Sequence, residues 1–182
     1  MPSIFLPTYR EGYESCLPVD RSLYIRLAPM MTGRALKDSW TAFEALMVRA
    51  RGGMRLLESD APNPSFPMLI LRPAAVQAMK PILERCGEIL PIHCADAAVS
   101  LFNVTTTIDA LDEAASKVVR FPSGRIMVVE RYVLRSDRLQ GATVFKLPHG
   151  QGSPILVADE FVQTWERAQL RGLYFRKVWS SE

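Results

Sequence analysis

Residues 155–178 read ILVADEFVQTWERAQLRGLYFRKV and carry the pattern that decides the fold class. The apolar run at 155–158 predicts a short strand, and Asp159 stands where a helix cap is expected. Gly172 is expected to end that helix before a second strand at 173–178. The helix would bury one side, formed by Phe161, Val162, Trp165 and Ala168. Strand, helix and strand are therefore predicted in succession.

A similar pattern occupies residues 68–92. An apolar strand at 68–71 leads into Pro73, which suits the first turn of a helix, and Gly87 precedes another apolar strand at 89–92. Pro81 lies inside the helical pattern and predicts a kink or two short helices. Because α/β proteins reuse this unit so often, we interpret the similarity as chance rather than as a duplication.

Weaker patterns fill the rest of the chain. They predict short strands at 4–6, 22–28 and 99–104, a helix or a strand at 40–50, a short helix at 109–116, and an antiparallel pair formed by 125–135 and 143–147. Strands dominate, so the predicted class is α+β: a single domain with a mixed, mostly antiparallel sheet, a few helices and an irregular N-terminal arm. Residues 1–60 are expected to pack as an arm and strands on a main α+β domain of residues 61–182.

Composition excludes several classes of protein. The chain has 182 residues, of which 48% are hydrophobic and 23% charged, with a net charge of +3. Such a chain can bury a sizeable core and is not disordered on a large scale. The cationic residues are not gathered around a recognisable nucleic-acid module, so no nucleic-acid partner is expected.

The N-terminal segment and the cysteines indicate a compartment. Met1–Leu6 lacks a basic and apolar signal sequence, and the longest uncharged runs, 97–108 and 147–158, are too short to span a bilayer. Three cysteines at ordinary spacing suit a reducing environment. A cytoplasmic protein without membrane contact is therefore expected.

One cluster could carry thiol or metal chemistry: Cys86, His93, Cys94 and Asp96. His93 and Cys94 are neighbours in a predicted strand, so their side chains point to opposite faces and do not converge easily. We predict no metal, no cofactor and no catalytic residue. A small cysteine-dependent hydrolase or transferase using residues 86–96 remains the alternative. The loop at 147–152 lacks the spacing of a phosphate-binding loop, and a plain connection is expected there.

Charge is unevenly distributed in the middle of the chain. Residues 95–116 hold four acids and no base, whereas 117–138 hold six bases against Glu130 and Asp137. Asp109, Asp112 and Glu113 are interpreted as helix-capping acids. Patches of opposite sign could also steer a protein partner, and the basic segment leaves a nucleic-acid-binding alternative open.

The order of these motifs resembles a known family. The relevant stretches are 68–71, Gly87-Glu88-Ile89-Leu90-Pro91, Leu101-Phe102-Asn103-Val104, Ile108-Asp109-Ala110-Leu111-Asp112 with Ser116, Gly141 with Val144-Phe145-Lys146-Leu147, Ile155-Leu156-Val157 and Gly172-Leu173-Tyr174-Phe175. From about residue 61 to 179, the chain resembles family eleven of the bacterial immunity proteins of polymorphic toxin systems, often found beside type VI secretion effectors.

The resemblance implies a non-catalytic protein that binds and neutralises one cognate toxin. Our hypothesis for the mechanism is direct occlusion of the toxin's active site or substrate path. A net charge of +3 argues against wholesale mimicry of DNA. Oligomeric state is left open. Candidate toxin-binding residues are Tyr9, Tyr13, Asp96, Asp109, Asp112 and Glu113. Trp40, Tyr132, Trp165 and Trp179 are further aromatic candidates, for which the core is the alternative place.

Overall fold

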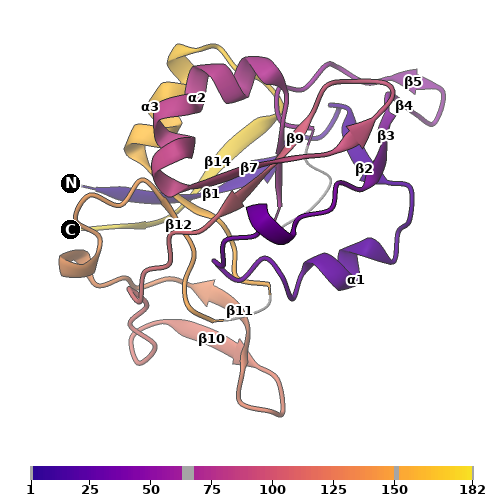
Figure 1. Cartoon of the computed structure of the whole chain (residues 1–182). Coiled ribbons are helices and arrows are strands. Elements are labelled where there is room, and N and C mark those ends of the chain that lie inside the picture. Colours follow the sequence, from indigo (N-terminus) through magenta and orange to yellow (C-terminus); the bar gives the residue numbers. More distant parts are fainter. Residues whose placement is uncertain (1, 63–67, 150–151, 182) are drawn as a thin grey trace.

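A computed structural model describes residues 2–62, 68–149 and 152–181 (Figure 1). The predicted loop residues Pro64 and Pro67, and Gly150 and Gln151 of the 147–152 loop, lie outside this range. The α-helices of the described residues are α1 (Leu23–Leu27), α2 (Pro73–Cys86) and α3 (Asp159–Arg167). The strands are β1 (Ser3–Tyr9), β2 (Ser15–Pro18), β3 (Glu44–Val48), β4 (Ala50–Arg51), β5 (Met54–Arg55), β6 (Leu69–Leu71), β7 (Gly87–Pro91), β8 (His93–Cys94), β9 (Ser100–Val104), β10 (Lys117–Arg120), β11 (Ile126–Arg131), β12 (Val144–Phe145), β13 (Leu156–Ala158) and β14 (Leu173–Ser180).

The C-terminal unit is a strand–helix–strand motif formed by β13, α3 and β14, and the N-terminal strand β1 lies between its two strands. Its sheet has the order β12-β13-β1-β14, and β1 is antiparallel to both β13 and β14. The N-terminal strand therefore fills the gap between the two strands that α3 connects. Asp159 accepts a hydrogen bond from the backbone N–H of Ser3 at 2.7 Å instead of capping α3, whose N-cap position is Ala158.

The unit at residues 69–91 repeats this arrangement. Its sheet has the order β6-β9-β7, and β9 is antiparallel to both of its neighbours. As in the C-terminal unit, a helix connects two parallel strands that are separated by one antiparallel strand, a split β-α-β motif. The similarity that the sequence suggested therefore extends to strand order and direction, and not only to the order of elements.

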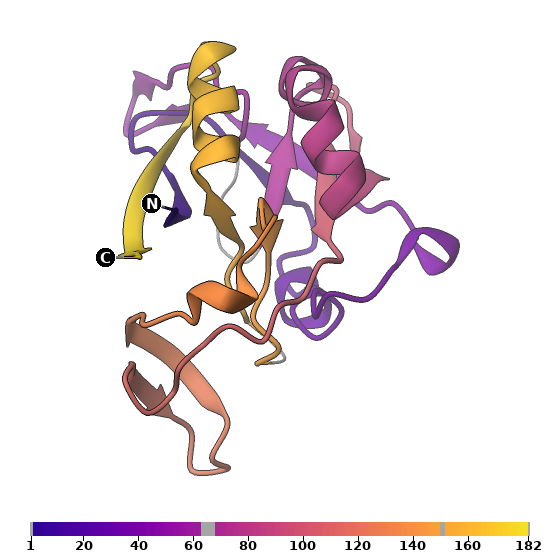
Figure 2. The ribbon, with the colours of Figure 1, turned by 90° about the vertical axis from the view of Figure 1, so that its left-hand side faces the viewer.

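Helices α2 and α3 lie side by side over these two sheets (Figure 2). Alternate residues of each strand face them: Leu69, Leu71, Phe102 and Val104 from one sheet, and Val157 and Leu173 from the other, pack with Phe161 and Trp165 of α3. The aromatic rings of Phe161 and Trp165 stack with their centroids 6.3 Å apart. Each sheet thus buries one face beneath the same pair of helices.

The opposite faces of the two sheets are covered by different segments. The N-terminal residues 16–47 pack on the first sheet, where Ile70, Leu90 and Leu101 join Met31 and Met47 in a buried cluster. Residues 110–139 cover the second sheet through contacts with Ile4, Leu6 and Leu156. Successive side chains along each strand point to opposite faces of its sheet and therefore enter different cores, as expected for sheets buried on both faces.

Several predictions of local structure are wrong. Residues 22–28 form the helix α1 instead of a strand, and 109–116 form turns instead of a helix. β11 pairs with β10 and not with residues 143–147, because β12 is paired with β13. Helix α3 ends at Arg167, five residues before Gly172, and α2 is one helix through Pro81 instead of two short ones, while the kink at Pro81 stays a prediction. Residues 40–50 contain the strand β3.

The fold class itself is confirmed. The described residues form an α+β domain with several mostly antiparallel sheets and three α-helices. The chain beyond β9 is hydrogen-bonded to the chain beyond β12 in a parallel bridge between Thr107 and Lys146, which links the two principal sheets. The boundary proposed at residue 60 stays a prediction, while β1 is an internal strand of the C-terminal sheet.

Gly87 is required by close packing at the start of β7. A Cβ atom here would lie 2.2 Å from the carbonyl oxygen of Asn103 and 2.7 Å from a ring carbon of Phe102. We expect Gly87→Ala to lower the free energy of unfolding by about 2 kcal/mol or more, because the central strand β9 must shift. Gly124→Ala is the control: its φ is +82° in open space, so only about 1 kcal/mol of backbone strain is expected. Urea denaturation measures both, and equal losses would contradict the packing explanation.

Lys146 carries a buried amine whose protonation makes the stability of the fold depend on pH. Its Nζ donates to the carbonyl oxygen of Met31 at 2.6 Å, and burial lowers the pKa of Lys146 from 10.5 to about 8. Between these values the unfolded chain binds more protons, so stability rises with pH and is lost as pH falls through 8. We expect the free energy of unfolding of the wild type, relative to that of Lys146→Met, to rise by up to about 1.4 kcal/mol per pH unit over this window.

Urea denaturation at pH 7.5 and 9.5 measures this gain. The exposed Lys80 supplies the matched control, because Lys80→Met removes an amine that stays largely in water. Wild type and Lys146→Met curves that run parallel with pH would contradict the assignment.

Candidate interaction surface

Strands β10 and β11 form a hairpin that projects from the body of the molecule (Figure 1). A turn at Pro122, Ser123 and Gly124 joins them, and the register is irregular at two places. Ile126, next to the turn, and Val129, in the middle of β11, enter the core beneath the hairpin, and Val118 of β10 packs against it. In both views the hairpin lies at the edge of the molecule, away from helices α2 and α3 (Figure 2).

Large apolar side chains are exposed on this hairpin. Met127 is 50% exposed, Val128 47% and Phe121 37%. We call these three residues the hairpin surface. Arg125 lies over the ring of Phe121, with its guanidinium carbon 5.0 Å from the ring centroid. Several exposed apolar side chains on a projecting element are typical of a protein-binding site.

The charges around the hairpin are largely paired within the chain. Lys117 lies 2.7 Å from Glu130 and Arg135 lies 3.0 Å from Asp109, while Arg120 forms an ion pair with Glu113. The acidic segment 95–116 and the basic segment 117–138 thus partly neutralise each other. This pairing weakens both the long-range steering and the nucleic-acid alternative that the sequence left open.

A pocket of about 420 Å³ separates the hairpin from the sheet behind it. Its floor is β1, from Leu6 to Tyr9, and its facing wall is the stretch Met127–Val129 with Tyr132. Arg176 of β14 lies beside Leu6, to which it is paired in the sheet. We call this cavity the β1 pocket.

The predicted toxin-binding residues fall into two groups. Asp109, Asp112 and Glu113 lie in the turns at the base of the hairpin, where Asp112 accepts a hydrogen bond from the N–H of Ala115 at 3.0 Å. The helix-capping role predicted for these acids is wrong, because no helix forms there. Two of the three carboxylates are engaged by arginines, as described above.

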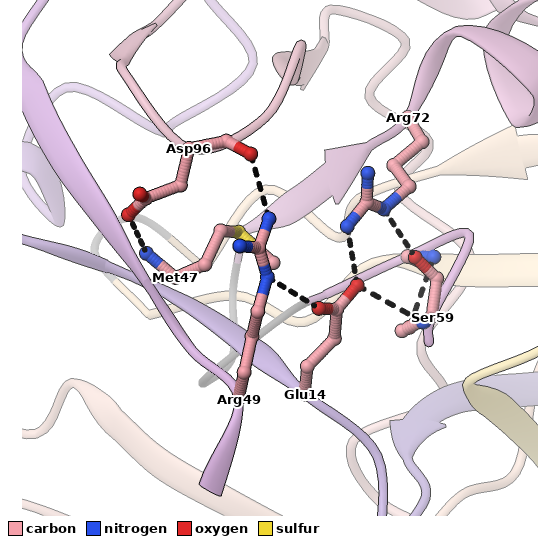
Figure 3. Close-up of polar contacts among 7 residues, drawn as sticks. Glu14, Met47, Arg49, Ser59, Arg72 and Asp96 are labelled. Atoms are coloured by element: carbon pink, nitrogen blue, oxygen red, sulfur yellow. Dashed lines mark hydrogen bonds and ion pairs between the residues drawn. The ribbon is translucent and has the colours of Figure 1, made fainter. Parts of the chain in front are cut away.

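Tyr9, Tyr13 and Asp96 lie elsewhere. Tyr9 is partly buried, lines the β1 pocket and donates a hydrogen bond from its hydroxyl to the carbonyl oxygen of Tyr13. Tyr13 itself is only 9% exposed. Asp96 accepts a hydrogen bond from the N–H of Met47 at 3.4 Å, while its carbonyl oxygen accepts one from Arg49 at 2.6 Å (Figure 3).

The other aromatic candidates are mainly core residues. Trp165 and Tyr132 are 2% and 7% exposed. Trp179 packs against the core beneath the hairpin. The indole N–H of Trp40 donates to the carbonyl oxygen of Pro91 at 2.9 Å.

Sequence reasoning missed Glu14, the centre of a buried polar cluster (Figure 3). It is 3% exposed and pairs with Arg72, and its carboxylate accepts a hydrogen bond from the N–H of Ser59 at 3.2 Å. Arg49 approaches the second carboxylate oxygen at 3.5 Å. A single glutamate among loop residues carries no signal, since its partners lie 35 to 58 positions further along the chain.

The cysteine cluster does not assemble. Cys86 is buried at the end of α2, whereas His93 is exposed on β8 beyond the five residues of β7, a distance of about 16 Å along an extended strand. Outside this cluster, burial raises the pKa of the Cys16 thiol to about 12. Among the described residues, no group of three or more histidine, cysteine or acidic side chains could hold a metal ion.

Residues 95–180 match the model of the Immunity protein family (Imm11). The resemblance to this family is therefore confirmed over just under half of the chain, which we call the Imm11 region. It includes the hairpin and Arg176 but not β1. The stretches at 68–71 and 87–91, also attributed to the family, lie outside the match. The search of curated proteins returned no match.

The match supports an immunity-protein role in general. Such a role suggests binding rather than catalysis, with a cognate toxin as the partner. In the part of the chain that is described, no helix is long and apolar enough to span a membrane.

Glu14→Gln tests whether the buried polar cluster stabilises the fold. The change leaves the guanidinium of Arg72, whose side chain is 17% exposed, without its closest counter-charge. We expect a loss of about 2–3 kcal/mol in the free energy of unfolding. The double variant Glu14→Gln with Arg72→Gln should lose less than the sum of the single variants.

Urea denaturation of the four proteins completes this cycle. Glu84→Gln, which removes an exposed partner of Lys80, is the control and should change stability little. Strict additivity of the two single losses would show that Glu14 and Arg72 do not stabilise one another.

Proposed function

We propose that this protein neutralises one cognate toxin by occluding its active site or substrate path with the hairpin surface. The observation that carries the proposal is the exposure of Met127, Val128 and Phe121 on a projecting hairpin inside the Imm11 region. In this proposal the toxin is a secretion-system effector and the complex forms in the bacterial cytoplasm.

Physical considerations support the hairpin as the contact element. Neutralisation requires that almost no toxin stays free, which calls for a Kd of about 10⁻⁹ M. Affinity of this order comes from a few well-buried apolar and arginine anchors surrounded by residues that exclude water. The exposed apolar side chains provide such anchors, and the guanidinium of Arg125 lies over the ring of Phe121 on the same hairpin.

The remaining predicted toxin-binding residues are proposed as the margin of this contact. Asp109, Asp112 and Glu113 adjoin the base of the hairpin, and Tyr9 lies across the β1 pocket from it. Tyr13 and Asp96 stay predictions at the more distant cluster around Glu14.

Co-expression with the toxin encoded by the adjacent gene tests the proposed role. The wild-type protein is expected to restore growth and to co-purify with that toxin in a one-to-one complex. Failure of both would overturn the proposal.

Met127→Asp tests the surface. We expect at least about a hundredfold weaker binding to a catalytically inactive form of the toxin, because a carboxylate must then be buried in an apolar contact. Met54→Asp is the matched control, since Met54 is 73% exposed on β5, outside the Imm11 region. Calorimetric titration measures both affinities. Equal affinities of the two variants would place the toxin on another face.

A further inference from the structure

The β1 pocket combines apolar walls with one charged group. Leu6, Met127, Val129 and Pro154 supply apolar surface, and Arg176 is the only charged side chain among its described lining residues. No described acid forms an ion pair with Arg176, although nine ion pairs are found elsewhere in the described chain. A cation is therefore available at the rim of an apolar recess.

The position of Arg176 follows from the register of the sheet. Arg176 pairs with Leu6, and Leu6 belongs to the core beneath the hairpin. Phe5 and Lys177 pair at the next position and lie on the helix side, where the Lys177 ammonium is 5.8 Å from the Phe5 ring centroid. Alternation along β14 thus directs Arg176 towards the hairpin and Lys177 away from it.

Tyr132 adds a neutral hydrogen-bonding group to the same recess. Its side chain is 7% exposed, and burial raises the pKa of its phenol to about 12, so the hydroxyl remains protonated at neutral pH. No described residue is hydrogen-bonded to this hydroxyl. A phenol and a guanidinium facing one recess form a pair of donors suited to a carboxylate.

We propose that the β1 pocket receives an apolar side chain of the toxin that lies next to a carboxylate, with Arg176 and Tyr132 binding the carboxylate. This inference rests on the proposed function and specifies how the hairpin surface recognises its partner. Two arguments select this occupant. The pocket continues from Met127 and Val128 of the hairpin surface, and its one cation calls for an anion beside the apolar group. The volume of about 420 Å³ accommodates one large side chain.

Small probes test the pocket without the toxin. N-acetyl-L-leucine carries both groups, N-acetyl-L-leucinamide lacks the charge, and N-acetylglycine lacks the apolar side chain. In an NMR titration of the whole protein, we expect the first to shift the resonances of Thr8, Met127 and Tyr132 with a millimolar Kd. The amide and the glycine derivative should each bind at least about tenfold more weakly.

Matched variants identify the charge that matters. Arg176→Gln is expected to abolish the preference for the acid over the amide, whereas Lys177→Gln, on the other face of β14, should preserve it. Equal binding of the acid and the amide to the wild type, or the absence of shifts at the pocket, would overturn the proposal.

The toxin itself supplies the second arm. Thr8→Trp fills the pocket from its floor, and we expect at least tenfold weaker toxin binding than for Thr8→Val, which keeps the shape of threonine. Arg176→Gln tests the same contact without filling the pocket. Because the arginine has no described ion-pair partner, its replacement breaks no ion pair within the described chain. If the wild type binds the toxin and these variants bind it equally well, the pocket proposal fails and the immunity function stands. If the wild type does not bind the toxin, both fail, whatever the probes show.

Discussion

The hydrogen bonds of β1 hold the C-terminal half of the molecule together. β13 and β14 are not neighbours, so α3 connects two strands separated by roughly 10 Å, a gap that β1 fills. The same strand lies between two cores, with Phe5 on the helix side and Ile4 and Leu6 on the hairpin side. It also forms the floor of the β1 pocket. The fold and the proposed toxin contact therefore depend on one seven-residue segment.

The strand β9 has the corresponding place in the other unit. It lies between β6 and β7, and its continuation reaches the chain beyond β12 through the bridge of Thr107 with Lys146. Lys146 in turn donates to Met31, in the segment that covers the far face of β9. Lys146 thus joins three parts of the molecule: its backbone forms the bridge between the two sheets, and its amine is hydrogen-bonded to the N-terminal segment.

Local pattern predicts the parts of this fold that are contiguous in sequence. The strands and helices at 68–92 and 155–178 are recognisable because each buries a continuous apolar face. Residues 22–28 mislead because Leu23 and Leu27 suit both an alternating strand and one side of a helix, in which Ile25 is 78% exposed. The turns at 109–116 replace a helix because Ala110 and Asp112 are hydrogen-bonded to the distant residues Arg135 and Val133.

The candidate site is less predictable, since it is formed by segments far apart in the chain. Tyr9 was found from sequence because it is aromatic, yet its place beside Met127 follows from the packing of the hairpin on β1. The acids at 109–113 gave a charge pattern without revealing the arginines that neutralise them. Glu14 gave no pattern, because its function depends on Ser59 and Arg72 after folding.

The pairing of β1 with β14 also sets the order in which the protein can form during synthesis. Ser3 pairs with Ser180, and the N–H of Ser181 donates to the carbonyl oxygen of Pro2, so the first strand is completed by the last one. At about 5–20 residues per second, a ribosome needs roughly 10–30 s to proceed from β1 to β14. Throughout that time β1 lacks its longest partner and exposes a strand edge to other chains. The nascent chain consequently cannot complete this sheet, or the pocket lined by β1 and Arg176, until β14 has been synthesised.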